Sequence, residues 1–245
     1  EGTDRMVQYL TEEEYPSSVK VIAANYLARA KGLELNIYKN RLFRILDESE
    51  HPDIRMAVAL AMGKTSGRDI FTSLQSALAE ESDYRVKCNL IRSLSNFPYI
   101  QVIEPMLTLV NDENIHIANT AADYLINKGN SNDATIYRNY LNDSLHHSIQ
   151  AKVYSATLKH MPVYYTNTKN LIKKDILSTI SKSKDPYEIA NYISALGYDP
   201  YSYEDIFKIS EEANSPIIKS ACASAITSLL QSPNFIRAYK GGHLR

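Results

Sequence analysis

The chain has 245 residues, 44% of them hydrophobic, and its 27 basic and 28 acidic side chains leave a net charge of −1. This length and hydrophobic content are enough for a sizeable core. Nucleic-acid binders usually carry a basic excess that this chain lacks, so we expect no nucleic-acid partner. No apolar run approaches the ~20 residues that a membrane-spanning helix needs, so we expect no membrane insertion.

A short helical pattern returns seven times along the chain. In four copies an apolar residue precedes a basic one, and in all seven small or apolar residues follow at positions +4, +5, +7 and +8. The first positions are Val19, Ile54, Val86, Ile117, Ile149, Glu188 and Ile218. Because these positions share one face of a helix, each copy predicts an inner helix against which a second helix packs closely. A recurrence of helical signals every 30 to 39 residues is typical of a stacked helical solenoid.

Apolar stripes between the copies predict outer helices that pair with the inner ones. Their expected ranges are 36–49, 68–81, 99–110, 132–142, 170–183 and 203–213. Asp, Ser and Pro precede the inner helices, where they suit helix starts. Glycines follow four of the inner helices, where we expect left-handed C-caps, at Gly32, Gly63, Gly129 and Gly197. The predicted fold is all-α, a right-handed α-α superhelix of about seven helix pairs.

We expect one solenoid domain over residues 1–245. The wider gap before the sixth copy contains the stretch 161–168, Met-Pro-Val-Tyr-Tyr-Thr-Asn-Thr, which predicts an extended connection or a bend. Neither end carries a strong capping repeat of the kind that usually finishes a solenoid. Since the sequence also begins at Glu1 without a methionine, we expect the domain to belong to a longer polypeptide.

The inner-helix pattern resembles the HEAT-repeat signature, Asp-x-x-Val-Arg-x-x-Ala-Ala-x-Ala-Leu-Gly or close to it. The best match runs from Asp53 to Gly63, and 83–87 and 218–226 also match well. The resemblance covers about residues 15–235 and implies an α-solenoid. In the family the Arg of the signature often pairs with the Asp of the turn. Three copies should lack this link, because their basic position is replaced by Ala118, Gln150 and Ile189.

Motifs for catalysis, metal binding or cofactor binding are absent from the sequence. His146 and His147 form the only close histidine pair, and neighbouring residues on a helix point about 100° apart, which is poor for sharing a metal. The segment 63–65, Gly-Lys-Thr, lacks the upstream glycine and strand of a phosphate loop. Cys88 and Cys222 lie at small inner-helix positions and are expected to be reduced and buried. We therefore expect no cofactor, no metal and no catalytic residue.

Positions +3, +6 and +10 of the inner helices would face a groove if those helices line one. In the third to sixth copies all twelve are polar or amphipathic: Asn89, Arg92, Asn96, Thr120, Asp123, Asn127, Lys152, Ser155, Lys159, Asn191, Ser194 and Tyr198. Amides and hydroxyls outnumber charges, which favours hydrogen bonding to an extended peptide or a neighbouring domain. An ordinary solvated helix face is the alternative. Tyrosines around 198–203 add a second candidate for a partner-binding patch.

The sequence thus predicts a non-enzymatic protein–protein interaction scaffold that presents a concave polar groove. The segments 215–226 and 231–235 are similar to stretches of bacterial envelope proteins that join HEAT repeats to a cyclophilin-type peptidyl-prolyl isomerase. That resemblance implies an alternative, the non-catalytic HEAT region of a larger envelope enzyme, because a cyclophilin is a β-barrel and no strand pattern occurs here. The cytoplasm and the bacterial periplasm or envelope both stay open as locations.

Overall fold

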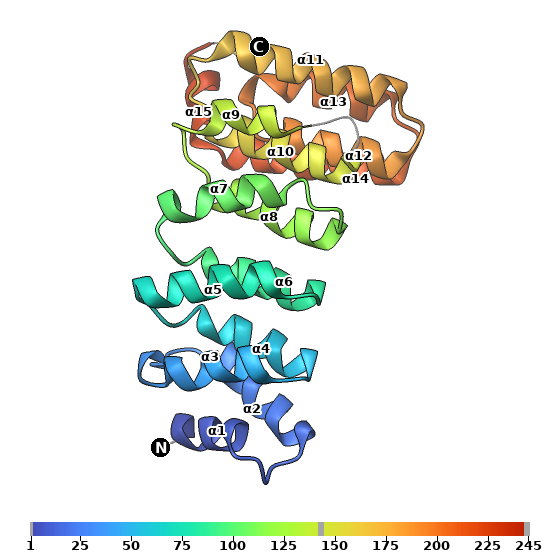
Figure 1. The fold of residues 1–245 in the computed structure, drawn as a ribbon. Helices are drawn as coiled ribbons and strands as arrows, with labels where there is room; N and C mark the ends of the chain where they lie inside the picture. The colour runs from blue at the N-terminus through green and yellow to red at the C-terminus, as the bar shows by residue number, and fades with distance from the viewer. Residues whose placement is uncertain (1, 142–144, 243–245) are drawn as a thin grey trace. The chain divides into compact units, whose positions relative to one another are not determined.

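In a computed structural model, which describes residues 2–141 and 145–242, every regular element within these ranges is helical (Figure 1). The α-helices are α1 (Gly2–Thr11), α2 (Ser17–Arg29), α3 (Lys39–Glu48), α4 (Pro52–Met62), α5 (Arg68–Glu80), α6 (Tyr84–Leu94), α7 (Tyr99–Leu109), α8 (Ile115–Lys128), α9 (Ala134–Tyr137), α10 (His147–His160), α11 (Thr166–Lys182), α12 (Pro186–Leu196), α13 (Tyr203–Glu212), α14 (Pro216–Gln231) and α15 (Pro233–Lys240). Short 3-10 helices occur at η1 (Asn36–Tyr38), η2 (Arg138–Tyr140) and η3 (Pro200–Ser202). The all-α prediction is confirmed.

The chain divides into two compact units, and the division falls between Ala121 and Ala122, inside α8. Consecutive helices pack in pairs within each unit, and Figure 1 shows those of the first unit stacked from α1 to α6. The first unit pairs α1 with α2, α3 with α4 and α5 with α6, while the second pairs α9 with α10, α11 with α12 and α13 with α14. This arrangement confirms the predicted repeat fold of stacked helix pairs.

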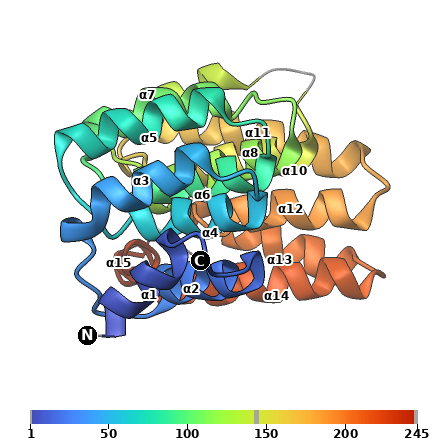
Figure 2. The same cartoon turned by 60° about the horizontal axis from the view of Figure 1, so that its bottom comes forward.

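The inner helices lie side by side within each unit. In the first unit α2 contacts α4 and α4 contacts α6; in the second, α10 contacts α12 and α12 contacts α14 (Figure 2). The small residues of the repeated pattern are buried at these contacts, as Ala24, Ala59 and Ala156 illustrate with 0% exposure. Small side chains let neighbouring helices approach closely, so the repeat in the sequence is a packing requirement.

Helix starts follow the predicted chemistry in part. Asp83 and Asp185 accept hydrogen bonds from backbone N–H groups two residues onward, and thereby cap α6 and α12. Proline occupies the first turn of α4, α12 and α14, where its missing N–H costs nothing.

The predicted burial of Cys88 and Cys222 is confirmed, and both are free thiols. Across the described ranges, no helix combines the length and the apolar character that a membrane crossing requires.

Two outer helices differ from their expected ranges. The helix expected at 132–142 is the four-residue α9 followed by η2, and residue 142 lies outside the described residues. The local sequence is rich in Asn and Asp, which favour turns, and the Asn130 side chain accepts two backbone N–H bonds there. Helix α11 begins at Thr166 rather than 170, so only part of 161–168 connects helices, with a turn at 163–164. A single domain with a bend at 161–168 stays a prediction.

The left-handed C-caps were predicted wrongly. Gly32 has a positive φ of 71°, but it lies two residues beyond the C-cap of α2, Ala30, whose backbone is extended. Gly63 and Gly197 have φ of −64° and −62°, and Gly129 is not among the positive-φ glycines. The last three glycines serve close packing instead. A Cβ on Gly197 would lie 3.1 Å from both Cα and Cβ of Ala225 on α14, which is tighter than ordinary contact. Glycine therefore lets the next inner helix approach.

Candidate functional site

In the second unit, residues of α8, α10, α12 and α14 line a shallow pocket of about 300 Å³. It is lined by Ile126, Ser148, Ala151, Lys152, Ser155, Asn191, Ser194, Gly197, Tyr198, Ser224, Ala225 and Ser228. Lys152 and Ser155 come from α10, Asn191 and Ser194 from α12, and Tyr198 from the turn after α12. The structure thus brings five of the predicted residues into one surface. Eight of its twelve lining residues are polar, although most of the exposed lining surface is apolar.

Serine hydroxyls of the pocket bond to the backbone of their own helices. Ser155 donates to the carbonyl of Ala151 at 2.8 Å and Ser194 to that of Ala190 at 2.9 Å. Ser228 donates to the carbonyl of Ser224 at 3.1 Å. A hydroxyl has one proton and two lone pairs. Because each proton is already used, the exposed oxygens of Ser194 and Ser228 offer acceptors to a ligand.

Two lysines stand beside these hydroxyls. The Lys152 ammonium contacts the Asp123 carboxylate at 2.7 Å, and the two side chains are 31% and 52% exposed. The Lys159 ammonium lies 5.6 Å from the centre of the Tyr198 ring, in the geometry of a cation–π contact. Lys159 therefore borders the pocket although it is not one of its lining residues. Asn127, near the end of α8, is exposed and is not part of the lining.

The predicted residues of the first unit have other roles. Asn89 is only 8% exposed, donates to the carbonyl of Met56 at 2.8 Å and accepts from Arg92. Asn96 donates to the carbonyl of Gly63 at 3.1 Å. Both side-chain amides therefore bond α6 and the turn after it to the backbone of α4 and its C-cap, so their N–H groups are already engaged within the unit. Thr120 bonds within its own helix, to the carbonyl of His116.

Exposure was predicted at all twelve positions, and it is wrong for two of them. Asn89 is buried because α4 and α6 pack closely enough for its amide to reach a backbone carbonyl. Ser155 is 4% exposed because the neighbouring helices cover its small side chain, although it still lines the pocket. A helical wheel places both residues on the outward arc, but it does not show how closely the next helix approaches.

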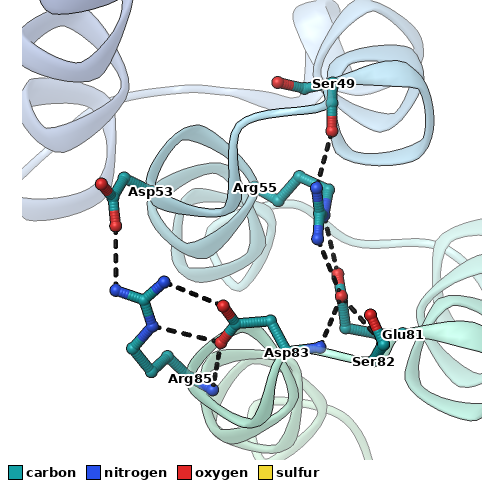
Figure 3. A network of polar contacts seen from close by, with 7 residues as sticks. All are labelled: Ser49, Asp53, Arg55, Glu81, Ser82, Asp83 and Arg85. Carbon is teal, nitrogen blue, oxygen red and sulfur yellow. Dashed lines mark hydrogen bonds and ion pairs between the residues drawn. The ribbon is translucent and has the colours of Figure 1, made fainter.

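A polar network connects successive turns of the first unit (Figure 3). The Arg55 guanidinium donates two bonds of 2.9 Å to Glu81 and a third, of 2.8 Å, to the carbonyl of Ser49. Arg85 bonds both Asp83, on its own helix start, and Asp53, one repeat earlier. The HEAT resemblance implied a link between the signature Arg and the turn Asp. Instead Arg55 holds Glu81, and the turn aspartates hold Arg85.

The electrostatics of this network favour the charged forms of its members. Burial alone would raise the pKa of Glu81, but hydrogen bonds from Arg55 and from the Asp83 backbone outweigh it and lower the pKa. The network borders a second shallow pocket of about 290 Å³, to which Asp47 and Glu80 also contribute. Since Arg55 and Glu81 satisfy one another, we assign this network to stability. Sequence analysis missed Glu81 and Arg85 as partners, although their charges in adjacent turns were a readable signal.

A buried ion pair lies close in sequence to the pocket of the second unit. Lys169 on α11 and Asp199, the residue after Tyr198, are 5% and 1% exposed, and their charged atoms are 3.8 Å apart. Oδ1 of Asp199 has no hydrogen-bond partner among the described residues. Burial raises the pKa of Asp199 and lowers the pKa of Lys169, with each partner opposing the shift of the other. No sequence pattern predicted this pair.

Fold and pocket define the class of protein: an all-α repeat protein of the solenoid type. No family model matches the chain, and no curated protein matches it either. Among solved structures, an engineered protein aligns with 93% of this chain and 96% of its own, at 15% identity and a TM-score of 0.43. A designed armadillo repeat protein aligns with 91% of this chain and 98% of its own, at 14% identity and a TM-score of 0.40. Likeness at this level supports no argument about family, partner or activity.

Proposed function

We propose that the chain is a non-enzymatic scaffold that holds an extended peptide, or a segment of a partner domain, on the inner-helix face of its second unit. One observation carries the proposal: the pocket of about 300 Å³, to which successive inner helices contribute eight polar residues of the twelve that line it. Stacked helical repeats build continuous binding surfaces in this way, since each repeat adds one helix to the wall. Backbone groups of a peptide match the hydroxyls, amide and phenol that line the pocket.

Selection from a displayed library of random peptides, with the chain as target, tests this function. We expect selected peptides whose binding is lost when the pocket is filled by Ser194→Gln, which adds bulk on an exposed position of α12 without adding charge. Ser181→Gln is the matched control. Ser181 is an exposed serine on α11 whose hydroxyl also bonds its own helix, and it lies away from the lining. Failure to select any binder, or equal binding by both variants, would refute the proposal.

We also propose that the repeats are of the HEAT type. The signature at 53–63 and the two-helix pairs of each unit support this assignment, because armadillo repeats contain a third helix. In the alternative function, this chain is the non-catalytic HEAT region of a larger envelope enzyme and positions the catalytic domain of that enzyme. A prolyl-isomerisation assay separates catalysis from scaffolding: we expect no acceleration of a test peptide by this chain, and clear activity would contradict the non-enzymatic proposal.

A further inference from the structure

We propose that the pocket of the second unit selects an acidic side chain of the bound peptide, with Lys152 as its counter-ion. This inference rests on the proposed function and names the chemistry of the occupant. It follows from three features of the pocket: the sign of its charges, the direction of its hydrogen bonds and the ion pair at its edge.

The one charged side chain in the pocket lining is a lysine. Lys152 lines the pocket and no carboxylate does, while Asp123, which pairs with Lys152 at 2.7 Å, lies outside the lining. Lys159, above the ring of Tyr198, adds a second cation at the border. An acidic side chain would therefore meet complementary charge, whereas a lysine or arginine of a partner would meet repulsion.

The hydrogen-bonding direction of the serines favours a peptide over an inorganic anion. The exposed serines Ser194 and Ser228 use their protons within their helices, so their oxygens can only accept. Backbone N–H groups of a peptide supply donors for these oxygens, and a carboxylate on the same peptide supplies the acceptor for lysine. A phosphate offers mainly acceptors, which suit the lysines but not the serines. The pocket thus matches a ligand that combines N–H donors with one anionic side chain.

The Asp123 carboxylate competes with a ligand carboxylate for the ammonium group of Lys152. Both side chains are partly exposed, so their contact contributes about 0–1 kcal/mol and can be replaced by a ligand carboxylate. Removing the lysine and removing the aspartate should consequently have opposite effects on an acidic ligand. A loss of fold would lower affinity in both cases, so the opposite signs separate recognition from structure.

Two rhodamine-labelled probes test the inference by fluorescence anisotropy at low salt: a peptide of alternating serine and glutamate, and the same peptide with glutamine for glutamate. We expect the glutamate probe to bind about tenfold more tightly than the glutamine probe. Lys152→Gln should remove most of that preference, and Asp123→Asn should increase affinity for the glutamate probe about threefold. Added salt should reduce the preference, since the charges are solvent-accessible.

The exposed pair Lys208–Glu212 on α13 provides matched controls for net charge. Its side chains are 75% and 69% exposed and lie outside the pocket lining. Lys208→Gln and Glu212→Gln should leave both affinities unchanged. Equal binding of the two probes, no binding of the glutamate probe, or weaker binding by Asp123→Asn would overturn the inference. If the glutamine probe still binds and Ser194→Gln abolishes that binding, the scaffold function stands and only the acidic preference fails.

Discussion

The guanidinium of Arg55 binds the carboxylate of Glu81 through two hydrogen bonds of 2.9 Å, although 26 residues separate them in the chain. Their side chains are only 15% and 8% exposed. Bidentate pairs of this kind are fixed in direction as well as distance, so they set the register of neighbouring elements. The third bond, to the carbonyl of Ser49, ties the turn before α4 to the turn before α6.

Replacing Arg55 by Met should destabilise the first unit. The change leaves the Glu81 carboxylate largely buried without its partner, and loss of a charged hydrogen bond of this kind costs about 2–3 kcal/mol. Urea unfolding followed by circular dichroism measures the change. Arg85→Met is the control, because Arg85 is 43% exposed and its loss should cost less than about 1 kcal/mol. Equal losses for the two variants would show that Arg55 is an ordinary surface residue.

The stability of the chain should depend on the ionisation of Glu81. The pKa of this carboxyl in the folded chain lies below its ordinary value of 4.5. A lowered pKa means that the folded state binds fewer protons than the unfolded state, so the stabilisation is complete above pH 4.5 and is lost as pH falls through the folded-state value. The difference in unfolding free energy between the native chain and Glu81→Gln should therefore shrink in acid. A difference that stays constant from pH 7 down to pH 3 would contradict this account.

The inner helices could be predicted from sequence because burial alone determines their pattern. Small residues such as Ala24 and Ala59 recur at helical spacing wherever the next helix packs, and the structure buries them. Polar residues carry no such constraint. Asn89 and Arg92 are neighbours on the outward arc of the helical wheel, yet Asn89 is buried and bonded to Met56 while Arg92 is exposed.

Position +10 of the repeat shows why the rest of the candidate site could not be predicted. Lys64 donates to the carbonyls of Leu27 and Ala30, and Asn96 to that of Gly63. Each therefore bonds carbonyls near the end of the preceding inner helix, a role that depends on how far apart the two helices lie. In the second unit the same position holds Tyr198, which lines the pocket. One sequence gives the residue type but not the spacing between helices that decides its role.

The buried pair Lys169–Asp199 should reduce stability relative to neutral side chains of similar size. Its charged atoms are 3.8 Å apart, and Oδ1 of Asp199 has no hydrogen-bond partner among the described residues, so the pair recovers little of its desolvation cost. The double variant Lys169→Met, Asp199→Asn should be at least as stable as the native chain in urea unfolding. Asp199→Asn alone should be less stable by about 3 kcal/mol, because it leaves the buried ammonium without a counter-ion. A double variant less stable than the native chain would show that the ion pair is a net source of stability.

Gly63→Ala should destabilise the first unit through the contact between α4 and α6. A Cβ at this position would lie 2.9 Å from Oγ of Ser93 and from Nδ2 of Asn96, and 3.1 Å from Cα of Ser93. The φ of −64° suits alanine, so the effect is steric and comes from the neighbouring helix. Overpacking of this kind costs about 1–3 kcal/mol, enough to outweigh the better helix propensity of alanine. Gly2→Ala is the control, because nothing lies within 4 Å of a Cβ there. If the midpoint of urea unfolding for Gly63→Ala equals or exceeds that of Gly2→Ala, the glycine is not needed for helix approach.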